Sequence, residues 1–170
     1  EFAVTCGDCT CRIGKDSGLL MGIEKDGKQL LAEPAAITLW RATTDNDSRV
    51  KAEWEAEFLH HVSFFARECH AQTADGTVTV KASGILSAPS KLPLYDVTLT
   101  YTANGTGLSI DLSADARPLR DHEGLLWTPN PGRELSLPRF GMRLVLVEGF
   151  ERLCYFGKGP QECYIDFAEH

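Results

Sequence analysis

The sequence has no long apolar run and comparatively few basic residues. No uninterrupted apolar stretch approaches the roughly 20 residues that a membrane-spanning helix needs. Lysine and arginine together number 17 against 24 aspartates and glutamates, which gives a formal net charge of −7 at pH 7. Because a nucleic-acid-binding surface needs clustered positive charge, we expect neither a membrane protein nor a nucleic-acid partner.

Cysteine is also sparse, with six in 170 residues, which is too few for a disulfide scaffold in a chain of this length. Three of the six stand close together, at Cys6, Cys9 and Cys11. A structural zinc site needs four ligands in two compact pairs, and the chain has no second Cys-x-x-Cys or Cys/His pair at the spacing of zinc ligands. We therefore expect reduced thiols on a pair of strands, with no metal site and no cofactor in this chain.

The overall composition is that of an ordinary globular domain, with 43% hydrophobic and 24% charged residues. A length of 170 residues suffices for one domain with a sizeable core. The sequence does not begin with Met, and no basic-then-apolar signal segment opens it. We expect a piece of a longer protein, and a cytoplasmic one.

Short alternating runs separated by turn residues dominate the chain. The clearest strands are 94–103 and 108–112, which alternate apolar and polar residues and are joined by Asn104-Gly105. Asp-Gly pairs at 26–27 and 75–76 suit hairpin tips, since both residues tolerate positive φ. The other expected strands are 2–5, 10–13, 19–23, 29–31, 37–40, 61–72 (or one more helical turn at its start), 77–82, 137–146 and 150–156. Many strands in series predict an all-β, antiparallel two-sheet sandwich with one short helix.

Residues 116–136 are different, because they carry several prolines and glycines and no regular pattern. Loops of this length in compact domains tend to be functional. Trp127 lies inside the segment. It either pins the loop to the core or contacts a neighbouring domain or subunit, where aromatic residues are favoured.

One stretch, Trp40-Arg41-Ala42-Thr43-Thr44-Asp45-Asn46-Asp47, changes abruptly from apolar to polar. Its last three residues are poor in strands and helix interiors but suit a helix N-terminus, where their oxygens accept bonds from free N–H groups. The following segment, 50–61, has an i, i+4, i+8 stripe of Val50, Trp54 and Phe58, which predicts a helix. The stretch is therefore either a well-capped helix start or a polar loop at the mouth of a sugar-binding pocket.

Two further motifs stand near the C-terminus: Leu137-Pro138-Arg139-Phe140-Gly141-Met142, and 155–166, which reads Tyr-Phe-Gly-Lys-Gly-Pro-Gln-Glu-Cys-Tyr-Ile-Asp. With the stretch at 40–47, they resemble, in order and spacing, the last domain of large bacterial β-galactosidases of glycoside hydrolase family two. The likeness runs from about Ser17 to Asp166. The chain departs from that pattern at Ser48-Arg49, where the family has Gly, at Cys163 (Asn) and at Phe167 (Arg).

The resemblance implies a galactose mutarotase-like super-sandwich that continues beyond Asp166 in the family, so residues 1–170 would be the N-terminal part of an incomplete domain. The parent enzyme would hydrolyse terminal β-D-galactosyl residues of lactose-type substrates, as a homo-oligomer. In the family, the two catalytic carboxylates and the Mg and Na sites belong to a preceding barrel domain. The partners implied are the parent's remaining domains and a galactoside at the domain boundary.

The resemblance also implies that Arg41, Asp45, Asn46 and Asp47 border the active site and bind or position substrate. We expect no catalytic residue in this chain. A retaining glycosidase needs two carboxyl groups about 5 Å apart, whereas the acidic residues of segment 50–61 read as a solvated helix face and the two aspartates read as caps. The tryptophan that the family stacks on the sugar has no counterpart here, and we expect the chain alone to be inactive.

Two other functions remain open from the sequence. A mutarotase-like enzyme needs a His acid and a carboxylate base facing one sugar. His122-Glu123 is an adjacent pair, but neighbours in an extended loop point apart. A free carbohydrate-binding module belongs to the same alternative. The third possibility is a structural module that serves interdomain contacts or oligomerisation.

Overall fold

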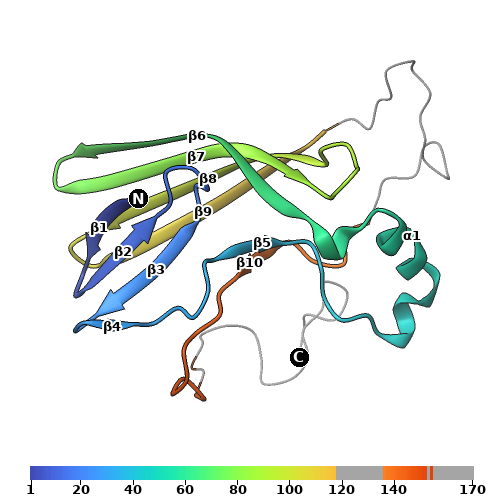
Figure 1. Ribbon diagram of the computed structural model, residues 1–170, viewed down its shortest axis with the longest axis horizontal. Helices are drawn as coiled ribbons and strands as arrows, with labels where there is room; N and C mark the ends of the chain where they lie inside the picture. The colour runs from blue at the N-terminus through green and yellow to red at the C-terminus, as the bar shows by residue number, and fades with distance from the viewer. Residues whose placement is uncertain (118–135, 153, 155–170) are drawn as a thin grey trace, which may run out of the picture.

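The computed structural model describes residues 1–117, 136–152 and 154, which form two four-stranded sheets, a two-stranded ribbon and one short α-helix (Figure 1). The first sheet follows chain order: β1 (Phe2–Cys6), β2 (Cys9–Ile13), β3 (Leu20–Lys25) and β4 (Lys28–Gln29). The second does the same: β6 (Ser63–Ala74), β7 (Thr77–Ser87), β8 (Tyr95–Asn104) and β9 (Gly107–Ala116). The ribbon pairs β5 (Ala36–Thr38) with β10 (Gly141–Arg143). All of these pairings are antiparallel, so the predicted all-β fold class is confirmed.

The hairpin tips obey the expected turn chemistry. Asp26 and Gly27 have φ of 50° and 74°, and Asp75 and Gly76 have φ of 49° and 73°. Two successive positive φ values match the right-handed twist of the strands that the turn joins. At the β8–β9 tip, the side-chain oxygen Oδ1 of Asn104 instead accepts hydrogen bonds from the backbone N–H groups of Thr106 and Gly107, which stabilise the turn.

The two four-stranded sheets pack against each other and share one core. Alternate residues of β7 and β8 are buried, as the predicted alternation requires. Tyr101 reaches from β8 across the interface, and its hydroxyl donates to the carbonyl oxygen of Gly18 at 3.0 Å. Burial raises the pKa of this hydroxyl. A second link joins the Gly7 N–H to the Asn104 carbonyl oxygen at 3.2 Å. These contacts make the molecule a sandwich-type domain.

A β-bulge interrupts the pairing of β6 with β7 between Ala66 and Glu68. Gly84 lies opposite this irregularity, paired with Ala66. A Cβ placed on Gly84 would lie 2.2 Å from the Phe65 carbonyl oxygen, closer than any real contact. The glycine is therefore required by the close approach of the β6 backbone.

The three clustered cysteines, Cys6, Cys9 and Cys11, lie on β1 and β2 as free thiols, as expected. Burial, with a smaller contribution from a hydrogen bond with Cys6, raises the pKa of the Cys11 thiol to about 12. A thiol with so high a pKa stays protonated at neutral pH, so it packs rather than reacts. Within the described residues, no group of three or more His, Cys, Asp or Glu side chains is arranged to hold a metal ion.

The predicted helix over 50–61 is wrong in its length. The α-helix α1 covers Lys51–Ala56, between 3₁₀ turns η1 (Asp45–Arg49) and η2 (Leu59–His61). The physical reason is Phe58, whose left-handed backbone (φ 54°) ends the helix. In the expected strand 61–72, His61 still belongs to the 3₁₀ turn η2, and the strand β6 (Ser63–Ala74) begins two residues later.

Two other strand predictions fail in the C-terminal part. In the expected strand 137–146, only β10 and an isolated bridge from Leu146 to Leu31 form pairs. Pro34, which has no N–H to donate, stands opposite the interruption. Of the expected strand 150–156, residues 150–152 and 154 are not in a strand, residues 150–152 follow a turn at Gly149 (φ 104°), and the remaining residues lie outside the described part of the chain. No α-helix in the described part of the chain is long and apolar enough to cross a membrane.

Candidate functional site: the Asp-Asn-Asp loop

After β5, the chain leaves the ribbon through buried Leu39 and enters the polar stretch predicted to matter. The 3₁₀ helix η1 starts at Asp45, so its N-cap residue is Thr44 and none of the three cap candidates Asp45, Asn46 and Asp47. Asp47 instead reaches back: its Oδ2 accepts from the Thr44 N–H at 2.7 Å and from the Thr44 hydroxyl at 3.1 Å. This is the return half of a capping box.

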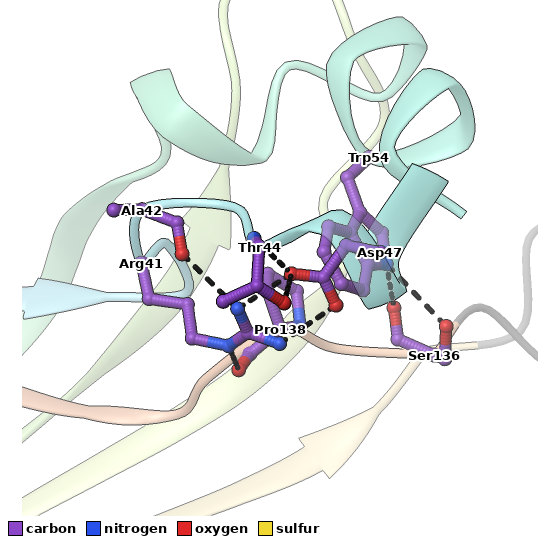
Figure 2. Close-up of polar contacts among 7 residues, drawn as sticks. All are labelled: Arg41, Ala42, Thr44, Asp47, Trp54, Ser136 and Pro138. Atoms are coloured by element: carbon purple, nitrogen blue, oxygen red, sulfur yellow. Dashed lines mark hydrogen bonds and ion pairs between the residues drawn. The ribbon is translucent and has the colours of Figure 1, made fainter. Parts of the chain in front are cut away.

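Asp47 also binds the guanidinium of Arg41 with both carboxylate oxygens (Figure 2). The distances are 2.6 Å from Nη1 to Oδ2 and 2.8 Å from Nη2 to Oδ1. Parallel bidentate bonds of this kind are the strongest carboxylate–arginine contact. Asp47 is only 7% exposed. The bonds from Arg41, and then those from Thr44, lower the pKa of Asp47 to about 2.

Arg41 holds more than its partner aspartate. Its Nε donates to the carbonyl oxygen of Pro138 at 3.0 Å, and its Nη1 donates to that of Ala42 at 3.0 Å. Its Cζ lies 5.7 Å from the ring centroid of Trp54, in a cation–π contact. One guanidinium thus touches the loop, helix α1 and a segment that is distant in sequence.

Trp54 makes the second link to that segment. The residue is 3% exposed, and its indole Nε1–H donates to the Ser136 carbonyl oxygen at 2.7 Å (Figure 2). The stripe that predicted a helix therefore has one deeply buried member, Trp54, while Val50 is half-buried and Phe58 exposed. Helix α1 is fixed chiefly by its tryptophan.

The structure divides the four predicted site residues into two pairs. Arg41 and Asp47 come together and bond to each other and to the backbone around them. Asp45 and Asn46 lie between them on η1 with exposed side chains. The first pair braces the loop, while the second pair is displayed by it.

Sequence reasoning missed Thr44, Ser136 and Pro138 as parts of this arrangement. Thr44-x-x-Asp47 fits the capping-box pattern, so its role was readable from the sequence. Ser136 and Pro138 contribute backbone carbonyls, which carry no residue-specific signal. His122, Glu123, Trp127 and motif 155–166 lie outside the described residues.

The chemistry of this site is one of positioning. An arginine-bound carboxylate with a pKa of about 2 is fully ionised at neutral pH and is a poor general acid or base. A nearby carboxylate, Glu57, is engaged with Lys91 at 3.4 Å. The described residues thus define an all-β sandwich-type domain with a rigid, braced polar loop at one end.

Comparison with known proteins identifies the family of this domain. The family described as "Beta galactosidase small chain" matches residues 5–169, and the chain belongs to it. The chain is 28% identical over 161 residues to a beta-galactosidase of Actinobacillus pleuropneumoniae, covering 94% of this chain and 15% of the relative. It is 29% identical over 157 residues to that of Lactobacillus delbrueckii subsp. bulgaricus (91% and 14%) and 26% identical over 155 residues to that of Staphylococcus xylosus (89% and 14%). The chain therefore spans about 15% of the curated relatives it matches.

Proposed function

We propose that this chain is the first part of the C-terminal sandwich domain of a β-galactosidase, and that loop 41–47 shapes the mouth of that enzyme's active site. The supporting observation is the Arg41–Asp47 brace, which fixes the loop while leaving Asp45 and Asn46 exposed. The family match and the relatives, which are beta-galactosidases matched over a small part of their length, support the parent activity.

In this proposal, the chain contributes no catalytic group, and the carboxylate pair belongs to the parent's other domains. Asn46 is the residue best suited to touch a galactoside at the domain boundary, because its amide both donates and accepts hydrogen bonds, as sugar hydroxyls do. Asp45 can only accept. Arg41 and Asp47, predicted as substrate-binding residues, act instead by holding η1 in place.

A second role, contact with other domains or subunits of the parent, is supported by the surface around β10. Four large apolar side chains are exposed there: Phe140, Leu144, Leu146 and Phe150. Aromatic side chains are favoured at the interfaces between proteins. A neighbouring domain or subunit of the parent enzyme that packed on these side chains would remove them from water, as a subunit interface of a homo-oligomer would.

The test is Asn46→Ala in the intact parent enzyme, with hydrolysis of a β-galactoside and thermal unfolding both measured. A disturbed positioning contact costs more in rate than in stability, so we expect kcat/KM to fall by about tenfold or more at an unchanged melting temperature. The matched control is Gln72→Ala, which removes an exposed amide from β6. An Asn46 variant that melts several degrees lower yet keeps its rate would defeat the proposal.

A further inference from the structure

A cluster of aromatic rings follows helix α1 and forms a surface of its own. The ring cluster consists of Phe58, His60 and His61, with Trp40 at one side. The ring centroids of His60 and His61 lie 4.2 Å apart, and Phe58 lies 6.0 Å from His60 and 6.4 Å from His61. Trp40 lies 5.2 Å from His60. Phe58, His60 and His61 are all exposed, so the rings meet each other at the surface of the molecule.

Neither backbone preference nor burial explains Phe58. It follows the end of α1 with φ 54° and ψ 36°, a left-handed position at which Gly or Asn is ordinarily found. A bulky side chain with positive φ is an outlier and stores strain. The residue is nevertheless 44% exposed, so only part of its surface is buried to offset this cost. An outward-facing ring held in an unfavourable backbone conformation points to a ligand.

Polar groups surround these rings. Lys91 Nζ lies 5.7 Å from the Phe58 ring centroid and 3.4 Å from a carboxylate oxygen of Glu57. The imidazoles of His60 and His61 add nitrogen donors and acceptors. Lys91 lies over the Phe58 ring, and the cluster as a whole combines ring surface with hydrogen-bonding groups, as small-molecule sites do.

We propose that the ring cluster is a second galactoside-binding surface, next to the loop but separate from it. A pyranose presents C–H groups on its faces and hydroxyls around its edge. In galactose, the axial 4-hydroxyl leaves the hydrogens of C3, C4 and C5 together on one face, which can pack against an aromatic ring while the hydroxyls bond to Lys91, Glu57 or an imidazole. The choice of a galactoside rests on the proposed function; the surface itself rests on the rings.

The ring cluster is also close to the polar loop, through Trp40. Trp40 directly precedes Arg41, and its ring meets Trp54 edge to face at 6.5 Å. The rings and the braced loop thus share one rigid unit. A galactoside on the rings would be held close to the proposed active-site mouth, where a longer or second sugar would be retained.

The experiment is a titration of the purified chain with lactose, followed by tryptophan fluorescence and by amide NMR shifts, with cellobiose as the glucoside control. We expect a saturable change with lactose, corresponding to a Kd of about 1 mM, and a much weaker one with cellobiose. Phe58→Gly removes the ring and suits the left-handed backbone, so it should weaken lactose binding at least about tenfold without lowering the melting temperature. His61→Ala, an exposed second variant, should weaken binding in the same direction.

Phe65→Ala, which removes another exposed ring, from β6, is the matched control and should bind lactose normally. Absence of saturation at millimolar lactose, equal binding by Phe58→Gly, or an equal response to cellobiose overturns the proposal. Asn46→Ala separates the two proposals: the ring cluster should bind lactose unchanged in that variant, even though the parent enzyme would lose activity.

Discussion

Arg41 and Asp47, six residues apart, close the polar loop with two parallel bonds of 2.6 and 2.8 Å. The same guanidinium donates to Pro138, almost one hundred residues further along the chain. A local ion pair and a long-range anchor thus depend on a single side chain. This arrangement makes Arg41 the residue whose replacement is most informative.

Arg41→Lys keeps the charge but cannot form the bidentate pair and the Pro138 bond together, since Lys offers a point charge and not a planar fork. Asp47 would remain largely buried with a weakened partner. We expect the melting temperature to fall by roughly 3 to 8 °C, measured by calorimetry or circular dichroism. Lys25→Arg, at an exposed pair with Asp8, is the control and should change it little. An unchanged melting temperature in Arg41→Lys would show that the brace is dispensable.

The lowered pKa of Asp47 predicts how stability depends on pH. A carboxyl whose pKa is lower in the folded chain than the ordinary value of about 3.9 stabilises the fold above that value and loses this contribution as pH falls toward the folded value. With the folded pKa at about 2, the loss falls between about pH 4 and pH 2. Asp47→Asn should therefore lose less stability than wild type across this window.

The measurement is denaturant unfolding at several pH values from 7 to 2, taken as the difference between wild type and Asp47→Asn. The difference cancels the other carboxyl groups, which the two proteins share. The gap should be largest near neutral pH and shrink below about pH 4. A gap that stays constant to the lowest pH would contradict the assignment.

Trp54→Phe tests the bond to Ser136 apart from the packing of the ring. The variant keeps an aromatic face for Arg41 but leaves the Ser136 carbonyl oxygen without its indole donor. A lost hydrogen bond of this kind costs about 1 to 2 kcal/mol of unfolding free energy, whereas Trp54→Ala should cost about 3 to 5 kcal/mol because it also leaves a cavity. Equal losses in the two variants would mean that the hydrogen bond, rather than the packing, carries the whole contribution.

Gly84→Ala tests the close approach at the β6 bulge. The added Cβ would meet the Phe65 carbonyl oxygen at 2.2 Å, so backbone must move, and we expect a loss of about 1 to 3 kcal/mol of unfolding free energy. Gly105→Ala is the matched control, since a Cβ there meets nothing within 4 Å. Denaturant unfolding of the two variants measures the contrast. Similar stabilities would show that β6 shifts at little cost.

The sheets were predictable because their signals are local. Alternation in 94–103 and the Asp-Gly pairs at 26–27 and 75–76 each follow from residues close in sequence, and the structure confirms them. The helix was overextended because apolar spacing does not report where the backbone turns left-handed, as it does at Phe58. Strand 137–146 forms only in part, at Gly141–Arg143 and at the bridge from Leu146, because pairing depends on a partner segment that contains Pro34, which has no N–H to donate.

The stretch at 40–47 was predicted as a capped helix start or a polar loop, and the structure shows a loop that leads into η1; its place at an active site stays a prediction, and the sequence did not distinguish the roles within it. Four polar residues within one seven-residue stretch look alike until the geometry shows that Arg41 and Asp47 bond to each other while Asp45 and Asn46 stay exposed. The anchors at Ser136 and Pro138 are main-chain carbonyls. Every residue carries a carbonyl, so no sequence pattern could identify these two.

The long reach of these anchors has a consequence for how the chain folds. Both four-stranded sheets pair only strands that are neighbours in sequence, so each can form by successive short hairpins. The loop, by contrast, lacks these bonds until Ser136 and Pro138, which follow the second sheet in sequence, reach it, and closing so long a stretch of chain carries the larger entropic cost. On a ribosome, the sheets can therefore assemble while the loop is still free, and the loop becomes rigid only after residue 138 has emerged.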